Sequence, residues 1–111
     1  MTDAQFIAAW SEALTSTDRD AFISDMALSS IFPAPEDGSF GQGLIDRLGS
    51  IWDAAHRSIR QIAADAGLSG RKLAGRFGIP YRTMGNWLTG VNKCPDYTRL
   101  MMQECVGLLT R

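Results

Sequence analysis

The chain is short of the residues that usually build metal and catalytic sites. Its 111 residues include one histidine, His56, and two cysteines, Cys94 and Cys105, which do not form a CxxC pair. Structural zinc sites use four cysteine or histidine ligands at close spacings, so we expect no zinc site. A serine–histidine–acid arrangement would depend on the one histidine, and no Gly-rich phosphate loop is present. We therefore expect no enzyme activity, no metal and no cofactor.

Long apolar runs are also missing. No stretch approaches the roughly 18 to 20 apolar residues that a membrane-spanning helix needs. The first residues, MTDAQFIAAWSEA, lack the basic start and the unbroken apolar segment of a secretory signal. The sequence therefore predicts a cytoplasmic protein with no membrane partner, in which both cysteines stay reduced.

Charge is divided unequally along the chain. Residues 1–55 contain nine acidic and two basic side chains, for a net charge of -7, whereas residues 56–111 contain nine basic and three acidic ones, for a net charge of +6. Such asymmetry suggests a polyanion as partner of the basic half. The alternative is that the two halves are solvated faces that attract each other.

The apolar residues recur every three or four positions, which predicts an all-α protein. We expect helices to start at Thr2 or Asp3 and at Thr17 or Asp18, and then to cover about residues 44–66, 70–77, 80–89 and 96–109. The helix over 44–66 has a weak point at Gly49–Ser50, where it can kink or divide. Two prolines and three glycines within residues 29–43 indicate a loop or linker. We accordingly expect an acidic helical extension and linker over 1–43 and a second domain over 44–111.

Residues 70–89 have the pattern of two short helices joined at a steep angle by a tight turn. Ala74 is small where the helices would cross, and Gly78 can adopt a positive φ in the turn. Met84 would face back into the angle, Trp87 would anchor the flank, and Pro80 suits the first turn of the second helix. This spacing is typical of a DNA-binding helix-turn-helix.

The stretch IRQIAADAGLSGRKLAGRFGIPYRTMGNWLTGVNKCPDYTRLMM resembles the helix-turn-helix domain of the Cro and phage-repressor (XRE) family, over about residues 55–109. The register is carried by Ala74, Gly78, Met84, Trp87 and Gly90. The resemblance implies a lambda-repressor-like fold with an N-terminal helical extension. It also implies a sequence-specific regulator, most simply a repressor, whose helix from about Pro80 to Thr89 reads the major groove of double-stranded DNA. One such helix buries little surface, so we expect a homodimer on two half-sites.

The family pattern implies DNA contacts at seven positions. These are Arg71, Lys72, Tyr81, Arg82, Thr83, Asn86 and Lys93. Arginine can pair with guanine and asparagine with adenine, which suits Arg82 and Asn86. Tyr81, the first position of the second helix, is also a base-reading position in the family, and Tyr81 and Thr83 could contact phosphate or a thymine methyl. Lys93 matches a position that often touches the backbone, and Arg71 and Lys72 could contact phosphate or only be solvated. Two glycines depart from the pattern, because Gly70 replaces a polar anchor and Gly85 interrupts the second helix at a cost of about 1 kcal/mol relative to alanine.

Two further questions stay open at the level of sequence. The N-terminal helices would either supply the dimer contact or extend the core, with Phe6, Trp10 and Phe22 as candidate anchors. The chain could also be a helix-turn-helix-derived interaction module, or an antitoxin-like protein whose acidic N-terminal part holds a partner protein. DNA binding predicts that Arg71, Lys72, Arg82 and Lys93 gather near the start of the second helix, whereas an interaction module predicts that they scatter or pair with the acidic half of the chain.

Overall fold

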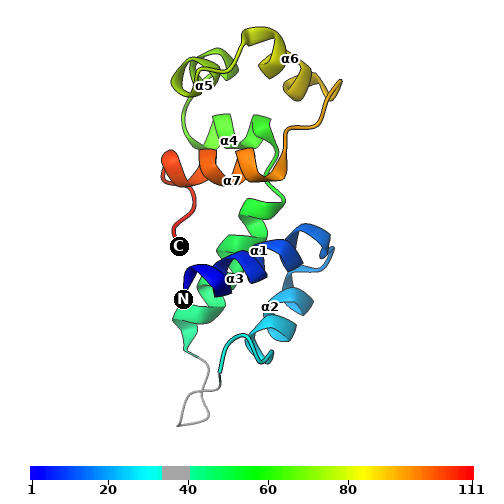
Figure 1. Ribbon diagram of the computed structural model, residues 1–111, viewed down its shortest axis with the longest axis vertical. Helices are drawn as coiled ribbons and strands as arrows, with labels where there is room; N and C mark the ends of the chain where they lie inside the picture. The colour runs from blue at the N-terminus through cyan, green and yellow to red at the C-terminus, as the bar shows by residue number, and fades with distance from the viewer. Residues whose placement is uncertain (34–40) are drawn as a thin grey trace. The chain divides into compact units, whose positions relative to one another are not determined.

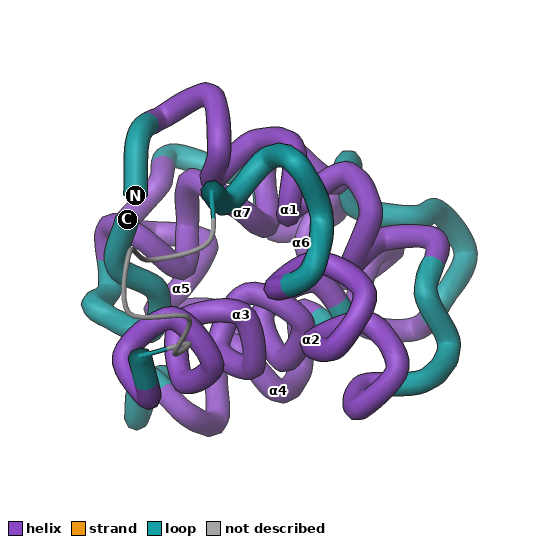
Figure 2. The backbone as a smooth tube through the Cα atoms, turned by 90° about the horizontal axis from the view of Figure 1, so that it is seen from below, coloured by secondary structure: helices purple, strands orange, loops and turns teal. Residues whose placement is uncertain are grey.

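The computed structural model describes residues 1–33 and 41–111, and the regular elements in these ranges are all helices. They are α1 (Asp3–Thr15), α2 (Arg19–Ala27), α3 (Gln42–Ala55), α4 (Ile59–Asp65), α5 (Gly70–Phe77), α6 (Tyr81–Thr89) and α7 (Asp96–Cys105) (Figure 1). The tube view shows helices and loops and no strand in the same ranges (Figure 2). The predicted all-α class is therefore confirmed. None of the described helices combines the length and the apolar character needed to cross a membrane.

The helices group into two compact units. The N-terminal unit comprises Met1–His56 together with Arg111, and the C-terminal unit comprises Arg57–Thr110. In the N-terminal unit α3 packs against both α1 and α2, and in the C-terminal unit α4, α5 and α6 contact one another. The division between the two units falls after His56, because α3 buries its apolar face with α1 and α2. The sequence pattern placed the boundary at residue 43. Part of the loop expected over 29–43 lies outside the described residues.

The aromatic residues of α1 and α2 form the core of the N-terminal unit. Phe6, Trp10 and Phe22 are 1%, 5% and 4% exposed. They are surrounded by further buried residues, among them Ala9, Ala13, Met26, Leu48, Ile51 and Ala54. Of the two roles considered from sequence, these three aromatics therefore extend the core, and they are not surface anchors for a second copy.

The helical stretch expected over 44–66 is divided at residues 56–58, and not at Gly49–Ser50. The Ser58 side chain accepts a hydrogen bond from the backbone N–H of Gln61, and the Gln61 side chain accepts one from the N–H of Ser58, which starts α4 with a capping box. Helix α3 continues through Gly49, where a Cβ atom would lie 2.5 Å from a guanidinium nitrogen of Arg19. The Arg19 side chain, whose Nε lies 2.9 Å from a carboxylate oxygen of Asp53, thus packs against Gly49.

The C-terminal unit has its own core, to which all four of its helices contribute. The buried cluster consists of Ile59, Ile62, Ala63, Leu73, Ala74, Met84, Cys94 and Met102. Half-buried Phe77, Ile79, Trp87 and Leu88 pack against it. Ala74 and Met84 are 0% and 2% exposed, so the small residue of α5 and the long residue of α6 both face the interior of the unit.

Candidate nucleic-acid interface

The turn between α5 and α6 is built from glycine and proline. The side chain of Ser69 accepts a hydrogen bond from the N–H of Lys72 at 3.1 Å and so caps the start of α5. Gly78 ends the helix with φ of 66°, the positive value expected from the sequence. The N–H of Ile79 then donates to the carbonyl of Ala74 at 2.9 Å, which closes the helix end in the way typical of a left-handed glycine cap. Pro80 follows as the cap of α6.

Helix α6 has one face in the core and the other in solvent. Met84 is buried, and Trp87 and Leu88 pack partly against the core cluster. Since residues four apart lie on the same face of a helix, Arg82 and Asn86 share the opposite face. Arg82 is exposed and Asn86 is half-buried. The helix therefore presents a guanidinium and an amide one turn apart, which is the separation at which two side chains can reach neighbouring groups of one ligand.

The end of α6 is held by a basic residue that the sequence reasoning did not single out. Gly90 terminates the helix with φ of 80°. A guanidinium nitrogen of Arg60, on α4, donates a hydrogen bond to the carbonyl oxygen of Leu88 at 3.2 Å. A positive charge at the C-terminal end of a helix interacts favourably with the helix dipole. Arg60 lies 28 residues before Leu88 in the chain, so no local spacing could have indicated this contact.

Two of the predicted site residues meet across the turn. The guanidinium carbon of Arg71, on α5, lies 4.9 Å from the centroid of the Tyr81 ring, on α6. This distance is within the roughly 6 Å over which a cation is attracted to an aromatic face. The contact links the first turns of the two helices at an exposed position.

The two unusual glycines have different surroundings. A Cβ atom on Gly70 would lie 2.6 Å from Cδ1 of Leu88, so Gly70 lets the start of α5 approach the end of α6. A Cβ atom on Gly85 would have no atom within 4 Å apart from its chain neighbours and the backbone of its own helix, and the φ of Gly85 is not positive. Packing within the described structure thus accounts for Gly70 and does not account for Gly85.

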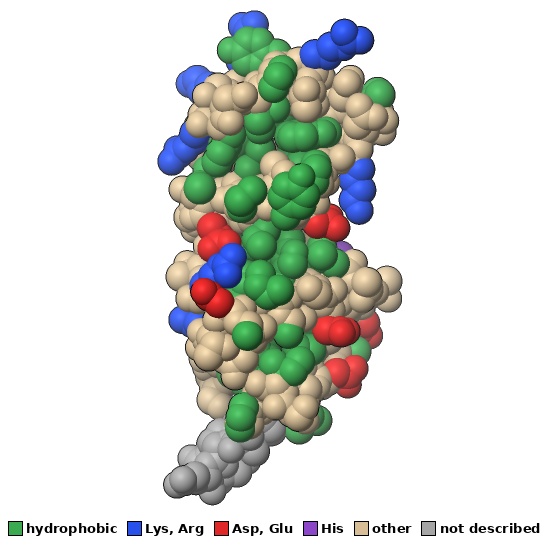
Figure 3. Space-filling view, viewed as in Figure 1, with side chains coloured by type: hydrophobic (Ala, Val, Ile, Leu, Met, Phe, Trp, Pro, Cys, Tyr) green, Lys and Arg blue, Asp and Glu red, His purple; other side chains and the backbone are tan. Residues whose placement is uncertain are grey.

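Positive charge on α5 and α6 is not neutralised locally. The sequence contains no acidic residue between Ala66 and Pro95. Within residues 1–33 and 41–111, no ion pair involves Arg71, Lys72, Arg76 or Arg82. On the face drawn in Figure 3, Lys and Arg side chains, and no Asp or Glu, lie at the end of the C-terminal unit that α5 and α6 form. This surface suits an anionic ligand.

The remaining predicted site residues, Lys72, Thr83 and Lys93, differ in exposure and in their partners. Lys72 is exposed on α5, and Thr83 is half-buried on the side of α6. Lys93 lies in the loop after α6, where its Nζ is 3.7 Å from a carboxylate oxygen of Asp96. Lys93 is therefore drawn toward an acidic side chain of its own unit, in contrast to Arg71, Lys72 and Arg82.

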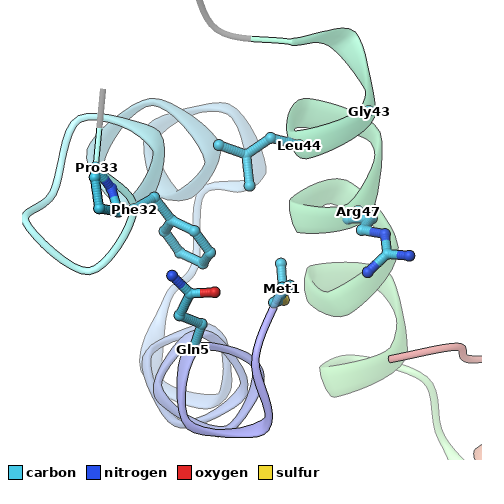
Figure 4. A pocket seen from close by; sticks show the side chains of 7 residues that line it. All are labelled: Met1, Gln5, Phe32, Pro33, Gly43, Leu44 and Arg47. Carbon is cyan, nitrogen blue, oxygen red and sulfur yellow. The ribbon is translucent and has the colours of Figure 1, made fainter. Parts of the chain in front are cut away.

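Other features of the chain offer less chemistry. A hollow of about 370 Å³ in the N-terminal unit is lined by Met1, Gln5, Phe32, Pro33, Gly43, Leu44 and Arg47 (Figure 4). Arg47 is the one charged side chain in this lining, so the hollow lacks a pair of groups for acid–base work. Burial raises the pKa of Cys94 to about 11, so its thiol stays protonated at neutral pH. In the part of the chain that the structure describes, His, Cys, Asp and Glu side chains do not gather into a group of three that could hold a metal.

No family model, curated protein or solved structure matches this chain. The geometry and the charge of α5 and α6 therefore carry the functional argument.

Proposed function

We propose that the chain is a sequence-specific DNA-binding transcriptional regulator, most simply a repressor, in which α5, the turn and α6 form a helix-turn-helix of the lambda-repressor type. The observation that carries the proposal is the outward face of α6, which presents Arg82 and Asn86 in a segment, residues 66–95, without any acidic side chain. The positive φ of Gly78 and the burial of Ala74 and Met84 support the same assignment.

In this proposal α6 lies in the major groove and α5 crosses the phosphate backbone. Arg82 donates two hydrogen bonds to a guanine and Asn86 pairs with an adenine, each contributing about 1 to 3 kcal/mol of discrimination. Arg71, Lys72 and Lys93 contact phosphates, which sets the register without reading sequence. The regulator is not an enzyme, works in the cytoplasm where bacterial DNA lies, and represses by occupying a promoter.

A homodimer is part of the proposal, because one recognition helix of nine residues reads only one half-site. Phe6, Trp10 and Phe22 are buried, so the contact must use other side chains. In the C-terminal unit, Tyr97 and Met101 are 67% and 54% exposed and lie one turn apart on α7. This uncharged pair can pack against the same pair of a second copy. Met101→Glu would then give a monomer in sedimentation and weaken binding to a two-half-site DNA.

The decisive experiment combines selection with mutation. Double-stranded DNA is selected from a random pool, and binding to the selected and to a scrambled duplex is followed by fluorescence anisotropy. We expect the double variant Arg82→Ala/Asn86→Ala to bind the selected duplex about 100-fold more weakly, because it loses two modest base contacts. Its affinity for the scrambled duplex should change little. Arg47→Ala, which removes an exposed arginine from α3, is the matched control and should bind like the wild type. Equal affinity of the wild type for both duplexes would refute the proposal.

The second candidate function is protein binding by the acidic N-terminal unit, as in an antitoxin-like protein. Glu12 and Asp25 line a second hollow of about 160 Å³ in that unit, together with the polar residues Thr15 and Ser16. This acidic recess suits a basic side chain of a partner protein. The selection experiment separates the two functions, because an interaction module would bind DNA weakly, without sequence preference and only at low salt.

A further inference from the structure

The contact between Arg71 and Tyr81 joins two elements of the proposed DNA surface. Arg71 is the second residue of α5 and Tyr81 is the first residue of α6. The guanidinium carbon lies 4.9 Å from the ring centroid, and Tyr81 is 58% exposed. The contact therefore stands at the surface, next to the turn that sets the angle between the helices.

The guanidinium carbon of Arg71 lies over the Tyr81 ring, and a guanidinium that meets a ring with its face keeps its hydrogen-bonding edge free. Its five N–H groups lie in the plane of the group, whereas the attraction to the ring uses the face. Arg71 has no acidic partner among the described residues. Its N–H groups can therefore still donate two parallel hydrogen bonds to a phosphate while the ring holds the guanidinium.

The contact with the ring also distinguishes Arg71 from its basic neighbour. Lys72 is exposed on the same helix, and among the described residues no ring or ion pair holds its side chain. A mobile side chain must be ordered when it binds, and this ordering weakens the complex. Arg71 is already positioned in the free protein, so it should contribute more to binding than a freely moving basic side chain does.

We infer that Arg71 and Tyr81 act as one phosphate-binding unit, in which Tyr81 is a positioning residue whose ring aims the Arg71 guanidinium at the DNA backbone. The inference rests on the proposed DNA-binding function. It assigns to Tyr81 a role through Arg71, in place of the separate base or phosphate contact that the sequence pattern implies. Through this unit α5 and α6 would engage the same stretch of phosphate backbone.

The test is a double-mutant cycle on the full chain with the selected duplex, measured over a salt series. Arg71→Ala should weaken binding about fivefold and reduce the slope of log K against log salt by about one, the change expected for one lost phosphate contact. Tyr81→Leu should weaken binding and lower the slope similarly, and Arg71→Ala should then add little. Tyr81→Phe keeps the ring and should retain both the affinity and the slope.

The control cycle combines Lys72→Ala with Tyr81→Leu, and here we expect the two effects to add. Thermal melting checks that each variant folds, which the exposed positions of all three side chains favour. The inference would be overturned if the effects of Arg71→Ala and Tyr81→Leu add, or if Tyr81→Phe reduces the slope of log K against log salt. Either result would leave the DNA-binding function standing. A wild type that does not distinguish the selected from the scrambled duplex would instead remove the proposed function.

Discussion

Helices α4 and α7 of the C-terminal unit use their charged side chains differently from α5 and α6. Arg57, between α3 and α4, pairs with Asp65 at 3.0 Å, and Arg99 on α7 pairs with Asp96 at 2.7 Å. Arg99 also donates to the carbonyl of Arg57 at 2.9 Å. On α5 and α6, by contrast, no described ion pair involves Arg71, Lys72 or Arg82. The first pair of helices uses its charges for stability, and the second leaves them available for a ligand.

The glycines within and at the ends of α5 and α6 differ in what accounts for them. A Cβ atom on Gly70 would meet the end of the Leu88 side chain, and Gly78 and Gly90 have positive φ values of 66° and 80°. Gly75, in the middle of α5, and Gly85, in the middle of α6, have neither reason within the described structure. In the proposed function, such helix-weakening residues would leave space for the DNA. The comparison thus separates residues that maintain the fold from those available for binding.

The largest effect is expected from the inward face of α6. Met84→Ala would leave a cavity in the core of the C-terminal unit and lower the free energy of unfolding by about 2 to 5 kcal/mol. Arg82→Ala, on the outward face two residues earlier, should change it by less than about 0.5 kcal/mol. Urea unfolding followed by circular dichroism measures both. Similar losses in the two variants would contradict the assignment of the faces.

A smaller loss of stability is expected at α7. The hydrogen bond from Arg99 holds the pKa of Asp96 below its usual value. Asp96→Asn should therefore destabilise the fold by about 1 to 2 kcal/mol at neutral pH, less than a fully buried pair because the carboxylate is partly exposed.

The acid dependence of the same pair has a defined sign. A lowered pKa in the folded state means that the contribution is present above the unfolded pKa, near 4, and is lost as the pH falls through the lower folded value. Wild type and Asp96→Asn should therefore converge in stability as the pH falls below about 4. A constant difference down to strongly acidic pH would contradict this account of the pair.

Gly85→Ala should change stability and binding in opposite directions. The variant should gain about 1 kcal/mol in unfolding free energy, because alanine favours a helix interior and a Cβ atom meets nothing there. If α6 lies in the major groove, the added methyl group should weaken binding to the selected duplex. Gly43→Ala on α3, where a Cβ atom also has free space, is the matched control and should leave binding unchanged. Stronger DNA binding by Gly85→Ala would show that the glycine merely loosens the helix.

The smallest effect concerns the two cysteines. Cys105 is exposed and Cys94 is buried with a pKa raised to about 11. A thiol reagent at neutral pH should label Cys105 in the native protein and Cys94 only after unfolding. Because the folded pKa of Cys94 is the higher one, its contribution to stability should fall as the pH rises from about 9 to 11. Mass spectrometry after timed alkylation checks the order, and equal labelling rates would contradict it.

The local structure was predictable where short-range physics decides it. The starts of α1 and α2, each expected at one of two adjacent residues, and the glycine ends of α5 and α6 follow from side-chain chemistry and φ preferences. Contacts between residues distant in the chain were not predictable. The Arg19 side chain over Gly49, the Leu88 side chain beside Gly70, and the Arg60 contact at the end of α6 depend on how helices pack, which no spacing in the sequence records.

The most direct test of the central claim is a titration of the ¹⁵N-labelled full chain with the selected duplex, followed by backbone amide chemical shifts. The account predicts that the largest shifts fall on the first turn of α5 around Arg71 and on the outward face of α6 at Arg82, Gly85 and Asn86. Amides of α4 and of the buried face of α7 should move little. Largest shifts in the N-terminal unit, or no shifts at all, would contradict the claim that α5 and α6 form a DNA-reading surface.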